Sequence, residues 1–268
     1  MHDDISDIRE YYDSSVENED GRLERHPVER DITWRYLNRF LPRSGKLLEI
    51  GAATGAYTIP LAEKGYEITA VDLSSSLLEK CREKVLERGL RSRVECVAAD
   101  ARNLSDIQST DYDAVLLMGP LYHLSDENDR LSVIRQVSER LKPGGRIFSS
   151  FISRYGIWRD ILVKSPQLIK YPEDVRSVLE TGKDLVVPSW NSQFRAYFVT
   201  VPEIEPLHAR FGFRTLALTG IELIPDEAYE KLSADERRLW LDLLVRIGTE
   251  PSVIGNSCHI LYIGEKPA

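Results

Sequence analysis

Long apolar runs and metal-binding spacings are missing from this sequence, and we expect no secretory leader. No run approaches the about 18–20 apolar residues that cross a membrane, and residues 1–4 are partly acidic, unlike a secretory leader. The cysteines, at positions 81, 96 and 258, and the five histidines match no zinc pattern. We therefore expect a cytoplasmic protein without a metal or membrane contact, with Cys81 and Cys96 in its core.

Excess basic charge is missing as well. The chain carries 35 Lys and Arg against 43 Asp and Glu, a formal net charge of −8. A nucleic-acid-binding surface needs clustered Lys and Arg, so we do not expect nucleic acid as a partner. At 268 residues, the chain is long enough to bury a large core without disulfides. The oligomeric state is left open by the sequence.

Short apolar runs alternate with amphipathic helical segments from residue 27 onward. Strands are expected at residues 47–50, 67–71, 94–98, 114–117, 146–152, 213–218 and 260–263. Helices are expected around residues 27–41, 57–64, 77–85, 131–141, 202–210 and 233–247. This alternation predicts an α/β fold, a doubly wound parallel sheet with helices on both faces. His208, in a charged helix, is expected to be solvated.

The alternation is interrupted at residues 154–195, which are rich in aromatic and basic residues. We expect this segment to be an inserted helical lid, because it is too short to build its own core. The whole chain is then one domain. Its parts are an N-terminal helical cap (1–41), a cofactor-binding core (42–152), an acceptor-side lid insertion (154–195) and the end of the sheet with an extra helix (196–268).

The turn from Gly51 to Gly55 joins the first expected strand to a helix. In α/β proteins such a turn presents backbone N–H groups at the edge of the sheet where nucleotides bind. The dinucleotide fingerprint needs glycines where this chain has Ala53 and Ala56. Alanine is tolerated in the turn if its φ stays negative, so we expect a nucleotide-type site of a different kind.

Two acids follow the next two strands. Asp72 is placed to accept hydrogen bonds from both hydroxyls of a ribose. Asp100 is placed to accept one from an exocyclic amine such as that of adenine. A nucleoside without phosphates therefore suits the site better than a dinucleotide. Asp72 as a helix cap and Asp100 as a turn former are the alternative interpretations.

Five segments, in this order and spacing, resemble the motifs of the class I S-adenosylmethionine-dependent methyltransferases. They are LLEIGAATG at 47–55, AVDLS at 70–74, ADAR at 99–102, YDAV with MGPLYHL at 112–124, and LKPGG at 141–145. The resemblance implies a Rossmann-like seven-stranded sheet of order 3-2-1-4-5-7-6 with an antiparallel last strand. It also implies S-adenosyl-L-methionine as the cofactor and assigns it a set of contacts, namely Glu49, Gly51, Ala52, Gly55, Asp72, Leu73, Asp100, Ala101, Met118 and Gly119.

The candidate catalytic residues are Tyr122 and His123, just after the fourth strand. His123 is the candidate general base because histidine titrates near neutral pH, and packing against the cofactor is its alternative role. Candidate substrate-binding residues lie in the N-terminal segment and the insertion, where structural roles are the alternative: Tyr12, Arg154, Trp158 and Trp190.

The leading hypothesis is an enzyme that methylates an oxygen, nitrogen or carbon of a small organic acceptor. A methyltransferase acting on tRNA, rRNA or protein is the first alternative. A nicotinamide-dependent oxidoreductase and a non-catalytic cofactor-binding module are more distant alternatives. The sequence does not identify the acceptor.

Overall fold

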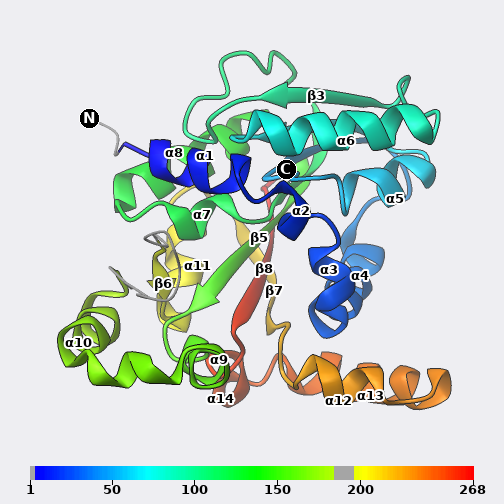
Figure 1. The fold of residues 1–268 in the computed structure, drawn as a ribbon. Helices are drawn as coiled ribbons and strands as arrows, with labels where there is room; N and C mark the ends of the chain where they lie inside the picture. Colours follow the sequence, from blue (N-terminus) through cyan, green and yellow to red (C-terminus); the bar gives the residue numbers. More distant parts are fainter. Residues whose placement is uncertain (1–3, 184–195) are drawn as a thin grey trace.

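The computed structural model describes residues 4–183 and 196–268 (Figure 1). In these residues one sheet of eight strands has the order β3-β2-β1-β4-β5-β8-β7, and β6 pairs with β5 outside this path. The strands are β1 Lys46–Ile50, β2 Glu67–Asp72, β3 Val94–Ala98, β4 Tyr112–Leu117, β5 Leu141–Ser153, β6 Phe198–Val199, β7 Arg214–Gly220 and β8 His259–Glu265. The predicted strand order is confirmed, because β8 and β7 are the expected last two strands, and β6 is an addition.

In the part of the sheet ordered β3-β2-β1-β4-β5, each strand is parallel to its neighbours. Strand β8 runs antiparallel to both β5 and β7. The carboxyl ends of β1, β2, β3 and β4 therefore lie at one edge of the sheet. In open α/β sheets this edge is where ligands bind.

Helices cover both faces of the sheet. Alternate residues of β4 point to opposite faces, so that Val115 and Leu117 join one hydrophobic core with α8 and α11, and Ala114 and Leu116 join another with α4, α5 and α13. The helices are α1 Ser6–Asp13, α2 Val16–Glu19, α3 Arg22–Arg25, α4 Pro27–Phe40, α5 Thr58–Glu63, α6 Ser75–Glu87, α7 Pro120–His123, α8 Glu127–Arg140, α9 Ile157–Lys164, α10 Pro172–Thr181, α11 Val201–Ala209, α12 Asp226–Glu230, α13 Ala234–Ile247 and α14 Pro251–Ile254, with a 3-10 helix at Pro166–Lys170. In the described residues no helix is long and apolar enough to cross a membrane.

Local signals explain several helix boundaries. Helix α13 begins with a capping box, in which Ser233 and Glu236 each hydrogen-bond the backbone N–H of the other. Helix α4 begins with Pro27, which suits a first turn because its missing N–H would have no partner there. Cys81 is fully buried and Cys96 partly buried, and both are free thiols.

The expectation that His208 is solvated is wrong. Its side chain on α11 is fully buried and stacks on Tyr262, with ring centroids 3.8 Å apart. Both ring nitrogens are satisfied, because Nε2 lies 3.1 Å from Ser149 Oγ and Nδ1 lies 2.8 Å from the Ile204 carbonyl oxygen. Burial lowers the pKa of His208 to about 4, so the imidazole is neutral.

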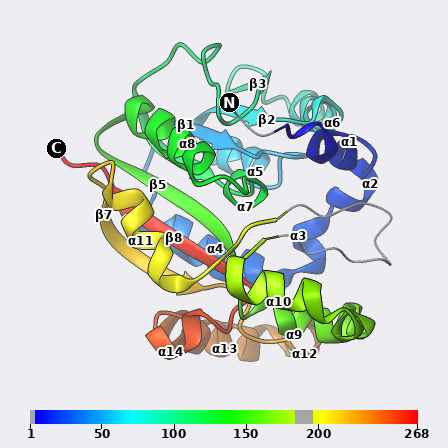
Figure 2. The ribbon, with the colours of Figure 1, turned by 90° about the vertical axis from the view of Figure 1, so that its left-hand side faces the viewer.

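Two groups of helices lie outside the two main layers. The N-terminal helices α1 and α2 pack against α6, and both views place α1 beside it. The insertion helices α9 and α10 lie at the same end of the molecule as α12, α13 and α14 (Figure 2). The insertion is therefore helical over residues 157–181, whereas Trp190 falls outside the described residues.

Candidate functional site

The turn after β1 has a backbone that glycine alone tolerates at its ends. Gly51 has a φ of 85°, and a Cβ there would lie 2.5 Å from the Met118 carbonyl oxygen. Gly55 has a φ of 89°, and a Cβ there would lie 2.8 Å from Cys81 Sγ. Between them Ala53 adopts a φ of 47°, so the expectation of a negative φ at this alanine is wrong. The left-handed conformation directs the Ala53 N–H to Asp72, with N and Oδ2 2.8 Å apart.

Asp72, the last residue of β2, is buried beside this turn. Its carboxylate accepts hydrogen bonds from the backbone N–H groups of Ala53 and Ser74. Burial raises the pKa of its carboxyl to about 6, although these bonds oppose the change. An ionised carboxylate has about four acceptor positions, so two backbone donors leave capacity for the hydroxyls of a ligand. The cap alternative does not apply, because Ser74 Oγ caps α6.

A cavity, called here the first cavity, lies along the carboxyl edge of the sheet and encloses about 730 Å³ including its mouth. Its polar groups include Asp72 and Asp100, from the ends of β2 and β3. Apolar residues from the same edge and from α1 form the rest of the wall, and the full lining is Ile5, Ile8, Tyr12, Glu19, Ile50, Gly51, Ala53, Asp72, Leu73, Leu77, Ala99, Asp100, Ala101, Met118, Gly119, Pro120, Tyr122, His123 and Leu124. Seven of the expected cofactor contacts thus line one cavity.

Asp100 stabilises a turn and also lines the first cavity. Its Oδ1 accepts a hydrogen bond from the Arg102 backbone N–H, as a turn former does, and its Oδ2 lies 2.7 Å from Arg102 Nη2. Arg102 is itself held by Asp129 at 2.8 Å. The Asp100 carboxylate is therefore fixed at the cavity wall with its side chain 27% exposed.

Three other expected cofactor contacts lie outside the first cavity. Gly55 lines neither this cavity nor the second one described below, because it packs on Cys81 beneath the turn. Ala52 and Glu49 line the second cavity. Glu49 is buried and accepts a 2.5 Å hydrogen bond from Thr58 Oγ1, and burial raises the pKa of its carboxyl to about 8.

Tyr12 and His123 meet over the first cavity although 111 residues separate them. Tyr12 Oη and His123 Nε2 are 2.8 Å apart, and the two rings pack edge to face. Helix α1 carries Tyr12 to this place because its Ile8 is buried in the core. The ring of Tyr122 lies next to His123, with centroids 4.8 Å apart.

A second cavity adjoins the first and shares with it Gly51, Ala53, Met118, Tyr122 and Glu19. Two ion pairs are associated with it, which the sequence analysis did not identify. Arg22 Nη2 lies 2.9 Å from Glu29 Oε2, and His259 Nδ1 lies 2.9 Å from Glu222 Oε2. Its other lining residues are Leu23, Thr33, Glu49, Ala52, Thr54, Ala56, Tyr57, Ser150 and Ile221.

None of the described residues of the insertion is part of the wall of either cavity. The Arg154 guanidinium is held by the Phe198 carbonyl oxygen at 3.0 Å and by Glu203 Oε1 at 3.2 Å. Trp158 packs against the hydrophobic cluster of the insertion. These contacts support the structural interpretation of both residues.

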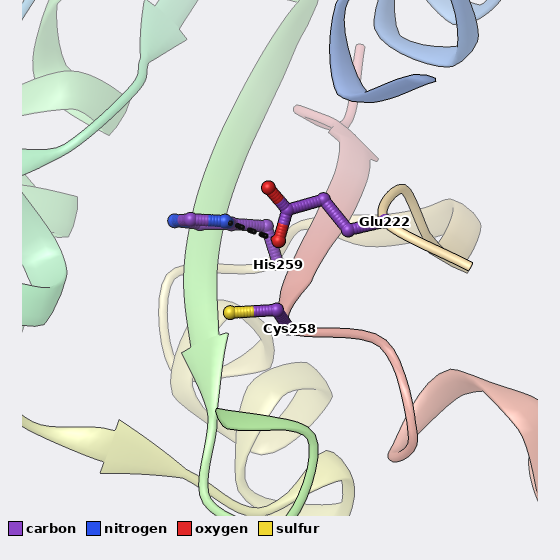
Figure 3. A group of neighbouring side chains, drawn as sticks. All are labelled: Glu222, Cys258 and His259. Atoms are coloured by element: carbon purple, nitrogen blue, oxygen red, sulfur yellow. Dashed lines mark hydrogen bonds and ion pairs between the residues drawn. The ribbon is translucent and has the colours of Figure 1, made fainter. Parts of the chain in front are cut away.

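Glu222, Cys258 and His259 form a group whose potential ligand atoms lie within 4.8 Å of one another (Figure 3). Metal ions bind the thiolate form of cysteine, and burial raises the pKa of the Cys258 thiol to about 11. His259 Nδ1 is already hydrogen-bonded to Glu222. The contacts therefore favour a hydrogen-bonded pair over a metal centre.

Comparison with known proteins finds methyltransferases both by sequence and by fold. A methyltransferase domain model matches residues 47–145. Ubiquinone biosynthesis O-methyltransferases of Idiomarina loihiensis and Xylella fastidiosa are each 32% identical, over 109 and 130 residues, which are 41% and 48% of this chain and 43% and 49% of theirs. The chain thus spans under half the length of these relatives.

Solved structures share the fold at low sequence identity. A methyltransferase from Methanosarcina mazei matches with a TM-score of 0.62 and 19% identity, covering 87% of this chain and 97% of that one. The 1,6-didemethyltoxoflavin-N1-methyltransferase of Burkholderia thailandensis matches with a TM-score of 0.60 and 16% identity, covering 98% and 88%. With the strand order, these findings show the fold of the class I S-adenosylmethionine-dependent methyltransferases, and the methyltransferase domain match covers residues 47–145 of the 268.

Proposed function

We propose that this protein transfers a methyl group from S-adenosyl-L-methionine to an oxygen, nitrogen or carbon atom of a small organic acceptor. The observation that carries the proposal is the convergence of the Gly51 turn, Asp72 and Asp100 on the first cavity. The relatives named above as O-methyltransferases support the same class of reaction.

The residues of the first cavity fit the cofactor on two counts. The Asp72 carboxylate retains acceptor capacity for the ribose hydroxyls, and a side chain at Gly51 would collide with Met118. Asp72 would then hold the ribose, Asp100 the adenine amine, and Leu73 the adenine face. When bound, the cofactor supplies an electrophilic methyl group.

The chain itself has to align the reactants and exclude water. In this proposal α1 belongs to a cap formed by residues 1–41, and the core of residues 42–152 holds the cofactor. The Tyr12 contact with His123 would close the cap over the first cavity. For His123, this contact supports a positioning role over that of a general base. The acceptor-side role of residues 154–195 stays a prediction.

A small acceptor is favoured over tRNA, rRNA or protein by the second cavity, which adjoins the first and is lined mostly by buried or partly buried residues. A cytoplasmic location is also proposed, because the cysteines are free thiols.

The direct test is a transfer assay with methyl-labelled cofactor and small-molecule extract from the source cell. We expect label in a small product together with S-adenosylhomocysteine, and mass spectrometry identifies the product. Label recovered only in added bulk tRNA or protein would contradict the small-acceptor proposal. Protection against thermal unfolding by NADH, and none by S-adenosylmethionine, would favour an oxidoreductase.

A further inference from the structure

We propose that the part of the second cavity around His259 is the acceptor site and that the His259 ring, oriented by Glu222, donates a hydrogen bond to the hydroxyl oxygen of a phenol or enol acceptor and stabilises its anion. This inference rests on the methyltransferase function proposed above and specifies its acceptor class. It assigns catalysis to a residue outside the family motifs of residues 47–145.

The His259–Glu222 pair is rigidly placed by the backbone between β7 and β8. Ser257 Oγ donates a 2.7 Å hydrogen bond to the His259 carbonyl oxygen and accepts a 2.8 Å bond from the Glu222 N–H. The Ile221 N–H also donates to the His259 carbonyl oxygen at 3.0 Å. Figure 3 shows the Glu222 carboxylate and the His259 imidazole facing each other. The ring is therefore oriented before any acceptor arrives, as a preorganised hydrogen-bond donor requires.

The Glu222 bond engages Nδ1, and in this proposal Nε2 faces the acceptor. Nε2 lies at the end of the ring away from Glu222 (Figure 3), and the His259 side chain lines the second cavity. Tyr122 lines both cavities, and its ring centroid lies 6.0 Å from that of His259. An acceptor in the second cavity thus adjoins the cofactor cavity. His123 has the opposite arrangement, because its Nε2 is bonded to Tyr12.

Several ionisable groups face this pair from different elements. Burial opposes a charge on His259, but the nearby carboxylates of Glu222 and Glu29 raise its pKa well above the ordinary value. Burial likewise opposes a charge on Glu222, while His259 and Arg22 lower its pKa. The remaining groups that act on the pair or on its neighbours are His26, Cys258, Tyr122 and Glu19. The pair therefore rests in the imidazolium–carboxylate state.

This charge state favours an oxygen acceptor. An imidazolium N–H can donate to a phenolate or enolate oxygen while other lone pairs of that oxygen stay available for attack. An amine has a single lone pair and would lose its nucleophilicity in the same hydrogen bond. The acceptor O–H proton is released to water while the imidazolium Nε2–H stabilises the oxygen anion. An oxygen electron pair then forms the bond to the methyl carbon, and the electron pair of the broken carbon–sulfur bond stays on sulfur. The ether and S-adenosylhomocysteine leave.

The walls of the second cavity suit a planar ring. The second cavity has apolar and aromatic surface from Tyr57, Tyr122, Met118 and Ile221. The Arg22–Glu29 pair adds charged groups to its wall. The polar contact at His259 then sets which hydroxyl group faces the first cavity.

The test uses phenols whose anions absorb visible light, 4-nitrophenol, 4-nitrocatechol and 2,4-dinitrophenol. Each is added to protein saturated with S-adenosylhomocysteine, at a pH about one unit below the pKa of the free phenol. For at least one phenol we expect the wild-type protein to raise the phenolate-to-phenol ratio about tenfold, which equals one pKa unit. His259→Gln and Glu222→Gln should both abolish the increase.

The matched control for the change of acid to amide is Asp111→Asn. Asp111 is exposed, pairs with Lys46 at 3.0 Å and lines neither cavity, so its variant should keep the increase. The inference is wrong if no phenol responds in the wild-type protein, or if His259→Gln responds equally. Calorimetry with S-adenosylhomocysteine distinguishes failure of this inference from failure of the proposed function. If the proposed function is wrong, the wild-type protein does not bind S-adenosylhomocysteine. If only this inference is wrong, the wild-type protein still binds it.

A proton NMR titration of the histidine rings provides a second readout that does not depend on activity. The His259 signal, identified by its loss in His259→Gln, should titrate well above the ordinary value. Glu222→Gln should move its pKa downward, because the carboxylate that stabilises the imidazolium is gone. An unchanged His259 titration in this variant would show that Glu222 does not act through His259 and would overturn the proposal.

Discussion

Asp72 is the buried acid beside the glycine turn, and replacing it with asparagine should change how stability depends on pH. Burial raises the pKa of its carboxyl from 3.8 to about 6. Because the folded pKa exceeds the unfolded one, the folded state binds more protons between these values, and the wild-type protein loses stability as the pH rises through this window. At about 1.4 kcal/mol per pKa unit, the loss reaches about 3 kcal/mol at neutral pH.

Asparagine is neutral throughout, so the Asp72→Asn protein escapes this loss. It pays instead a cost that does not vary with pH, because its amide has one oxygen for the two backbone N–H groups of Ala53 and Ser74. Urea unfolding of both proteins at about pH 4.5 and pH 7 measures the effect. The stability of the variant relative to wild type should rise by about 2 kcal/mol between these values. An equal difference at both pH values would refute the reasoning.

Two further predictions concern other unusual residues. Ala53→Gly should stabilise the protein by up to about 1 kcal/mol, because glycine accepts the φ of 47° without strain. Ala52→Gly, the control, should destabilise it by about 0.5–1 kcal/mol. Equal losses of unfolding free energy for the two variants in urea would contradict this prediction. His208 has a folded pKa of about 4, below the unfolded 6.5, so the unfolded state binds more protons and stability falls as the pH drops through this window. His208→Gln should reduce this acid-induced loss, by up to about 3 kcal/mol, and an unchanged pH dependence of unfolding would show that His208 is not buried as a neutral ring.

The sheet could be predicted because its strands are continuous apolar runs that end at glycine or acidic residues. Strand β3 has the predicted bounds, and β1 and β2 each differ by one residue. Strand β6 has two residues, too few for any periodic pattern, and it forms because β5 extends far enough to pair with it. The burial of His208 could not be predicted, because its partner Ser149 comes from β5, 59 residues away.

The cofactor side of the site could be predicted because its motifs are local turns at strand ends. The acceptor side depends on contacts between distant segments. Tyr12 reaches His123 only through the packing of α1, and Glu222 reaches His259 only because β7 and β8 pair. The residues that line the second cavity come from α2 to α4, the end of β1 and the turn after it, the β4–α7 region, β5 and the β7–β8 region, and no single stretch of sequence records that arrangement.

Calorimetric titration with S-adenosylmethionine tests most directly the claim that the first cavity binds this cofactor through Asp72. We predict that the wild-type protein binds it and that Asp72→Ala weakens binding by about 1–3 kcal/mol, the scale of lost charge-assisted hydrogen bonds. Asp111→Ala is the matched control, because this exposed acid pairs with Lys46 and lines neither cavity. Binding with equal affinity to the wild-type and Asp72→Ala proteins, or no binding to the wild-type protein, would contradict the account.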